Sequence, residues 1–224
     1  MKEIIVIIAS IFFIAACQNN ILKNITKSDI DIVTEIHINN AKSEIEDLII
    51  KLYKLNPVYI KKNEKFNSVS GVIIDVFKVI DVKKIDTTGQ ENIDLILQGF
   101  EEDFSGDRIY FITKGLYGMI YASYNYKDKF YLTDQKLSSK KLMNTATNLE
   151  TLVWRLSNTK VNNVLLIKTN NTDGQKMNLS FERLFGKLIN NQENMARIIS
   201  SQEGRMIQSA AKKIVSTIFL PIGF

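Results

Sequence analysis

The sequence predicts an all-α fold, a helical bundle of about five to seven helices behind a short N-terminal segment. Apolar residues recur at steps of three and four along most of the chain, which is the spacing of one face of a helix. The 224 residues include only 2 prolines, so few helices can be interrupted. Side chains that cap helices precede several of the apolar stretches.

The N-terminal segment has the pattern of an exported protein. An apolar run of 11 residues, Ile4 to Ile14, follows Lys2, and it is too short for a spanning helix, which needs about 20 residues. The run ends in Ile14-Ala15-Ala16-Cys17, which resembles the lipobox of bacterial lipoproteins. The resemblance implies cleavage before Cys17 and acylation of its thiol, with membrane attachment through the N-terminal lipid. Gln18 follows in place of Asp, so the best-known signal for inner-membrane retention is absent.

We therefore expect a lipoprotein signal peptide over residues 1–16, a polar lipidated tether over 17–27 and a single helical domain over 28–224. The motif departs from the commonest lipobox at Ile14, where leucine is usual, and Glu3 leaves the charged region nearly neutral. The alternative is an ordinary signal peptide followed by a free thiol. Lipidation accounts for the lone cysteine, since two or three acyl chains at about 0.8 kcal/mol per buried methylene attach a protein permanently.

Ser28 opens the first predicted helix, because Asp31 stands three residues on in an acidic variant of the capping box. Asn56-Pro57 ends this helix. His37 lies on its apolar stripe, where we expect a buried, hydrogen-bonded core histidine. The next segment, Val69 to Val82, has helical spacing but β-branched composition, so we favour a helix and leave a strand open.

A turn ending at Gly89 precedes a third predicted helix, which reaches Phe104. Asp107 recaps the chain for a fourth helix, and Gly115 and Gly118 on its inward side predict close approach of a neighbouring helix. A loop follows over residues 125–133.

The fifth predicted helix begins at Ser138 or Ser139, and Val161 to Lys168 after it suits either helix or strand. A final helix extends from about Asn178 to Phe219, with a break at Asn190-Asn191 or Gly204 left open. We expect the apolar terminus, residues 218–224, to pack into the bundle or against a second copy, which leaves a homodimer open.

The composition removes most enzymes. One Cys and one His allow no intramolecular disulfide, no Cys/His zinc site and no Cys-His or Ser-His catalysis beyond what His37 alone could support, so we expect no enzyme, no metal and no cofactor. The formal charge is +5, and 24 of the 29 basic residues are lysines. Paired lysines such as Lys61-Lys62 and Lys140-Lys141 suit sulfated glycans or anionic lipid; the alternative, and the commoner role of scattered pairs, is ordinary solvated surface. We do not expect nucleic acid as a partner of an exported, lipid-anchored chain.

Tyrosines gather in one region, where Tyr110 to Tyr131 holds six of them within 22 residues, interleaved with lysines. Tyrosine anchors many protein interfaces. The candidate partner-binding residues are therefore those predicted to lie in the loop: Tyr126, Lys127, Lys129 and Tyr131. The alternative is that tyrosines of the fourth helix only pack between helices, with their hydroxyls at the rim.

The chain resembles the borrelial surface lipoproteins in its loose lipobox and its Lys/Asn/Ile-rich composition. Ile120-Tyr121-Ala122-Ser123-Tyr124-Asn125-Tyr126 is similar to the Tyr-Ser-Ser-Leu-x-Tyr stretch of the helical family that includes complement regulator-acquiring surface proteins. Ala122 stands in place of the first Ser and Tyr124 in place of the Leu. The resemblance implies a helical outer-surface protein, some relatives of which bind host complement regulators, and it brings no catalytic residues.

These observations predict a lipid-anchored bacterial protein of the outer membrane, displayed on the cell surface, that binds a host macromolecule or acts at the host interface in virulence. Its partner would be a host protein or a sulfated glycan. The alternative is a periplasm-facing lipoprotein with a structural role in the envelope.

Overall fold

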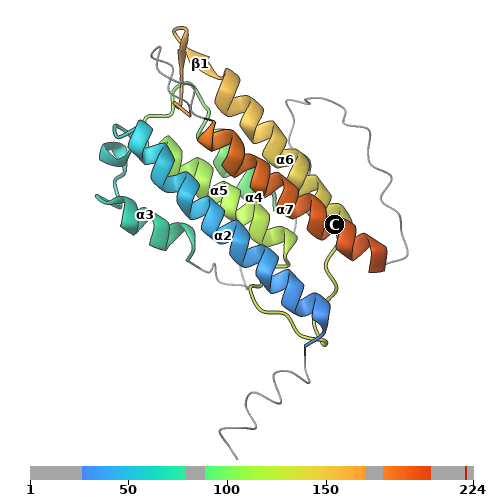
Figure 1. Cartoon of the computed structure of the whole chain (residues 1–224). Coiled ribbons are helices and arrows are strands. Elements are labelled where there is room, and N and C mark those ends of the chain that lie inside the picture. Colours follow the sequence, from blue (N-terminus) through green and yellow to red (C-terminus); the bar gives the residue numbers. More distant parts are fainter. Residues whose placement is uncertain (1–26, 79–88, 170–178, 203–219, 221–224) are drawn as a thin grey trace, which may run out of the picture.

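The computed structural model describes residues 27–78, 89–169, 179–202 and 220, and it confirms the all-α fold (Figure 1). Six α-helices lie within these ranges: α2 (Asp29–Leu55), α3 (Val69–Val76), α4 (Gln90–Gln98), α5 (Arg108–Ser123), α6 (Ser139–Asn158) and α7 (Ser180–Gln202). The same ranges hold one short 3-10 helix, η1 (Ile60–Lys62), and one hairpin of strands β1 (Lys160–Val161) and β2 (Val164–Leu165).

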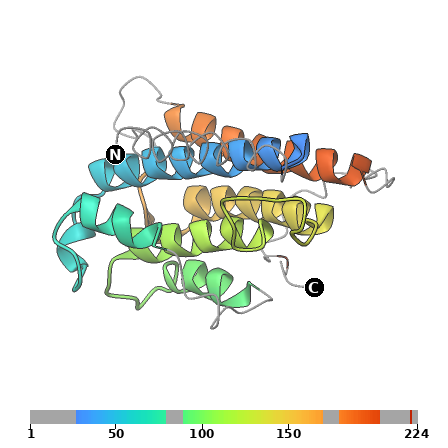
Figure 2. The same cartoon turned by 90° about the horizontal axis from the view of Figure 1, so that it is seen from below.

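The helices form three layers (Figure 2). The α2 and α7 helices lie side by side in one outer layer, α5 and α6 form the middle layer, and α4 covers the far side of α5. The α3 helix contacts both α2 and α5 at one edge. The α5 helix is therefore covered by four others, and 13 of its 16 residues are buried.

The start of α2 is the predicted capping box. The Ser28 amide donates to Asp31 Oδ2 at 2.7 Å, and the Asp31 amide donates to Ser28 Oγ at 3.4 Å. The helix ends at Leu55, directly before Asn56-Pro57. The Asn56 side chain then joins this end of α2 to the segment after β2, since its Nδ2 donates to the Lys168 carbonyl and its Oδ1 accepts from the Lys168 amide, both at 2.8 Å.

His37 makes hydrogen-bonding contacts between α2 and α7, as expected, but it is half-buried rather than buried. Its Nδ1 lies 3.2 Å from the Asn191 carbonyl, and Asn191 Nδ2 donates to the His37 carbonyl at 2.9 Å. This reciprocal pair explains why α7 passes through Asn190-Asn191 without the break left open from the sequence. The predicted extension to Phe219 lies beyond Gln202, outside the described residues.

The close helix approach predicted from Gly115 and Gly118 is present between α4 and α5. A Cβ on Gly118 would lie 1.9 Å from Asn92 Oδ1, and one on Gly115 would lie 2.4 Å from the Asn92 carbonyl oxygen. Both distances are far below any non-bonded contact, so only glycine allows α4 to lie this close to α5. The predicted Asp107 cap of α5 is also confirmed, with its side chain accepting from the Tyr110 amide.

The sequence allowed either a helix or a strand in two segments, Val69 to Val82 and Val161 to Lys168, and the structure has a helix in the first and a hairpin in the second. Val69–Val76 is helical, with Ser68 Oγ accepting from the Gly71 amide at its start; residues 79–82 of that prediction lie outside the described part. The segment after α6 instead pairs Val161 with Val164 in an antiparallel hairpin. Its turn residues Asn162 and Asn163 have φ of 52° and 64°, which asparagine tolerates better than most residues.

The prediction that the third helix reaches Phe104 is wrong. The α4 helix ends at Gln98, and Phe104 lies in the loop that follows. The reason is tertiary: the buried Arg108 guanidinium donates to the carbonyls of Gly99 and Glu102, both at 3.1 Å, and so holds this loop in a non-helical path. At the other terminus, Leu220 exchanges two backbone hydrogen bonds with the Asn148 side chain of α6, at 2.7 and 2.8 Å. The terminus therefore contacts the bundle at this residue.

We predict that Gly118→Ala destabilises the protein by about 3 kcal/mol, because the added methyl group displaces Asn92 and separates α4 from α5. Gly186→Ala is the matched control, since nothing lies within 4 Å of its added Cβ in α7. It should stabilise the protein by up to about 1 kcal/mol through helix propensity. Urea unfolding of the three proteins measures both changes; equal effects of the two substitutions would contradict the close contact.

Candidate functional site

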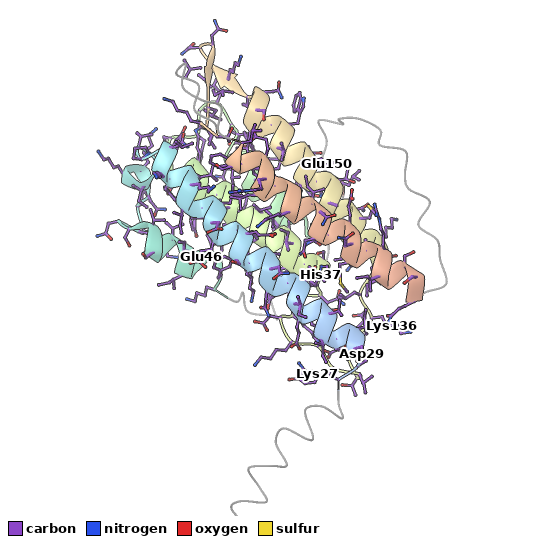
Figure 3. The ribbon with its side chains drawn as sticks, viewed as in Figure 1. Lys27, Asp29, His37, Glu46, Lys136 and Glu150 are labelled. Carbon is purple, nitrogen blue, oxygen red and sulfur yellow. The ribbon has the colours of Figure 1, made fainter. Side chains whose placement is uncertain are left out.

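The predicted Tyr/Lys residues lie on the connection between α5 and α6, here called the α5–α6 loop (residues 124–138). This loop packs against the first turns of α2, at the end of the bundle where the N-terminal segment enters. We call this the proximal end, and the opposite end, where α2 finishes and α5 begins, the distal end. Figure 3 shows Lys27, Asp29 and Lys136 together at the proximal end.

The structure brings Tyr126 and Lys127 into contacts within the protein. Asn125 and Tyr126 have φ of 54° and 56°, which turns the chain sharply after α5. The Tyr126 ring then meets Tyr121 edge-on at 5.8 Å between centroids. Lys127 forms an ion pair with Asp134 across the loop. These two side chains therefore shape the loop.

Tyr131 and its neighbours attach the loop to α2. The Phe130 amide donates to Glu35 Oε1 at 2.9 Å, and Lys27 forms an ion pair with the same carboxylate. Lys27 Nζ also lies 5.1 Å from the centre of the Tyr131 ring, a cation–π contact. Lys129 stays exposed. Partner binding by Tyr126, Lys127, Lys129 and Tyr131 stays a prediction.

Three of the clustered tyrosines, Tyr117, Tyr121 and Tyr124, belong to the core, and the hydroxyls of Tyr117 and Tyr124 are buried rather than at a rim. Tyr117 and Tyr121 are 3% and 4% exposed and stack at 5.3 Å. Tyr124 is fully buried beside Phe130, and burial raises the pKa of its hydroxyl. Tyr121 and Tyr124 pack against Tyr126 and Phe130 of the loop, and all three core tyrosines are too buried to contact a partner.

A shallow hollow of about 170 Å³ lies between the α5–α6 loop, α2 and the end of α7. Its apolar lining comes from all three elements: Ile30, Phe130, Leu132, Leu137 and Ile199. Leu132, at its edge, is 62% exposed. Sequence reasoning missed Leu132 and Lys136, although an isolated leucine in a polar loop is a visible signal.

The distal end holds a second hollow, of about 320 Å³, that sequence reasoning did not find. Its lining includes three aromatic side chains, Phe104, Tyr110 and Phe111, with Lys62 and Lys65 at the edge. The Asp107 carboxylate beneath it accepts hydrogen bonds from Tyr53 Oη at 2.6 Å and Asn63 Nδ2 at 2.8 Å. Burial raises the pKa of Asp107, and these hydrogen bonds oppose that rise.

Asp75 joins α3 to α5 next to this hollow. It accepts from Tyr110 Oη at 2.7 Å and forms ion pairs with Lys65 at 3.0 Å and Lys114 at 3.4 Å. Burial alone would raise the pKa of Asp75, but the hydrogen bonds from Tyr110 and Lys65 and the charge of Lys114 outweigh it, so the pKa is lowered. The ionised carboxylate therefore stabilises the folded state.

Because the pKa of Asp75 is lower in the folded than in the unfolded protein, its stabilisation is present above about pH 4 and is lost as pH falls below that value. We expect Asp75→Asn to cost about 1 kcal/mol or more at pH 7, and this cost to shrink at pH 3. Urea unfolding at both pH values measures the difference. Asp103→Asn, at an exposed carboxylate of the same end, should change little at either pH; a cost for Asp75→Asn that is equal at both pH values would contradict the assignment.

The described residues hold neither a metal centre nor a membrane span. Within the described ranges, no three His, Cys, Asp or Glu side chains are grouped so that they could hold a metal ion. None of the described helices combines the length and hydrophobicity needed to cross a bilayer. Cys17, the predicted lipidation site, lies outside the described residues. Comparison with protein families, with curated proteins and with solved structures finds no match.

Proposed function

We propose that this protein is a lipid-anchored bacterial outer-surface protein that acts at the host interface by binding a host macromolecule. The observation that carries the proposal is the sequence Ile14-Ala15-Ala16-Cys17, followed ten residues later by Lys27 at the start of the folded bundle. Two or three acyl chains on Cys17 would hold the chain at a membrane permanently. The rival function is a structural role in the envelope, facing the periplasm.

The arrangement of the bundle supports a surface role. Ten residues reach at most about 36 Å, so the proximal end stays near the lipid whatever path the tether takes. The α2 helix has 27 residues and is therefore about 40 Å long. The distal end can thus extend well beyond the membrane, and there the hollow lined by Phe104, Tyr110 and Phe111 offers aromatic contact area to a host protein or a sulfated glycan.

The anchor is tested with Cys17→Ala, which removes the only thiol in the chain. The native protein should partition into the detergent phase on temperature-induced phase separation, and the variant should move to the aqueous phase because it cannot be acylated. Ser28→Ala is the control, since it changes only the cap of α2 and should partition as the native protein does. A Cys17→Ala variant that stays in the detergent phase would sink the lipoprotein proposal.

Exposure on the cell is tested by protease treatment of intact cells. We expect the native protein to be removed while a periplasmic marker protein survives. Protection of the protein until the outer membrane is permeabilised would favour the periplasmic structural role instead.

A further inference from the structure

The α5–α6 loop has the composition of a membrane-contact surface. The loop holds three lysines and two aspartates, and the first turn of α6 adds Lys140 and Lys141, so residues 125–141 have a formal net charge of +3. Both aspartates are already neutralised, since Asp128 pairs with Lys42 at 3.1 Å and Asp134 pairs with Lys127. The exposed lysines of the loop itself are Lys129 and Lys136, and they supply its positive charge toward solvent.

The apolar part of this surface is Leu132. Its side chain is 62% exposed, and the exposed polar residues Thr133 and Gln135 follow it. Phe130, two residues before, is buried and fixes the loop to the core, so Leu132 is presented from a supported backbone. Tyr131, half-buried beside it, is a residue type that favours the headgroup region of a bilayer. An apolar tip flanked by lysines suits the interface of an anionic membrane.

The position of the loop selects a membrane over other anionic partners. The loop contacts Lys27 and Glu35, and Lys27 is ten residues from Cys17. If Cys17 is acylated, as proposed above, Lys27 lies at most about 36 Å from the lipid. The loop contacts Lys27 and is therefore held at about the same distance. The nearest anionic surface to this loop is then the leaflet that holds the anchor.

We propose that the α5–α6 loop docks on that leaflet, with Leu132 entering the interface and Lys129 and Lys136 contacting the phosphate groups of anionic phospholipids. Docking would fix the proximal end against the membrane and point the distal hollow outward. The Tyr/Lys region would then serve orientation rather than capture of a host protein. The inference rests on the proposed lipid anchor for its geometry, but the affinity of the loop for lipid is a property of the unacylated chain.

The test therefore uses residues 17–224 with Cys17→Ala, which carries no acyl chain, in sedimentation with vesicles. Vesicles of equal parts phosphatidylcholine and phosphatidylglycerol should bind the protein, and pure phosphatidylcholine should bind it far less. The double substitution Lys129→Gln/Lys136→Gln should lower the partition coefficient by about tenfold or more. Leu132→Ser should lower it by about fivefold. Melting temperatures should be unchanged, because all three side chains are exposed.

Matched controls come from elsewhere on the surface. Lys61→Gln/Lys62→Gln removes the same charge from the distal end, and Ile74→Ser removes an apolar side chain that is 73% exposed on α3. Both should bind vesicles as the parent protein does. If the distal lysine variant loses as much binding as the loop variant, the attraction is general and the docking surface is refuted.

Insertion of Leu132 has its own readout. In a Trp154→Phe background, which removes the only tryptophan, Leu132→Trp should shift its fluorescence to shorter wavelength on mixing with anionic vesicles. Ile74→Trp in the same background should not shift. Absence of the shift at position 132 would overturn the inference, as would loop variants that lose binding to heparin or to a host protein while vesicle binding persists. None of these results depends on whether Cys17 is acylated, so a failure here is distinct from a failure of the proposed anchor.

Discussion

Burial of α5 is the constraint on which the rest of the structure depends. Nearly every residue of this helix is inside the protein, so it needs a neighbour on each side. The α4 helix meets it at the glycine pair, α2 and α6 flank it, and α3 covers the remaining edge. A helix of this kind cannot be stable alone, because its apolar surface is removed from water only when the others are in place.

The two ends of α5 then determine what the protein displays. At its start, Asp107 caps the helix and also accepts from Tyr53 and Asn63, so one carboxylate ties α2 and the segment after η1 to the distal end. At its finish, Tyr124 lies in the core and two residues with positive φ turn the chain outward. The proximal loop is thus set by the same helix that organises the distal hollow, and its lysines and Leu132 are held at a fixed place relative to α2.

Local chemistry determines which features could be predicted from sequence. The Ser28 capping box, the stop at Asn56-Pro57 and the Ser138 cap depend on residues within one turn of each other, and all three are present. The glycines of α5 were informative because a residue without a side chain on an apolar helix face leaves a gap that a neighbouring backbone can fill. The Arg108 guanidinium that ends α4 early, in contrast, acts through tertiary contacts that no local pattern reveals.

The candidate site shows the same contrast between features set by local sequence and features set by tertiary contacts. Clustering of tyrosines and lysines located the α5–α6 loop, but composition could not show that Lys127 and Tyr131 have partners within the protein. Nor could it show that the loop contacts Glu35, 95 residues away, and so lies beside the start of the chain's folded part. The distal hollow was missed because its residues come from η1, the α4–α5 connection and α5, and meet only in the folded state.

A weak contact is sufficient for the role inferred for the loop. A chain held within about 36 Å of a membrane by its tether experiences that surface at an effective concentration in the millimolar range, so a millimolar intrinsic affinity already keeps the loop docked for much of the time. Two exposed lysines and one leucine supply an attraction of that order. Attachment and orientation then have separate causes. Acyl chains hold the protein at the membrane but do not fix the angle of the bundle to it, and three exposed side chains on a supported loop fix that angle. A higher affinity of the loop for lipid would not improve retention, because the acyl chains already hold the protein at the membrane. A surface of three side chains is therefore sufficient for orientation.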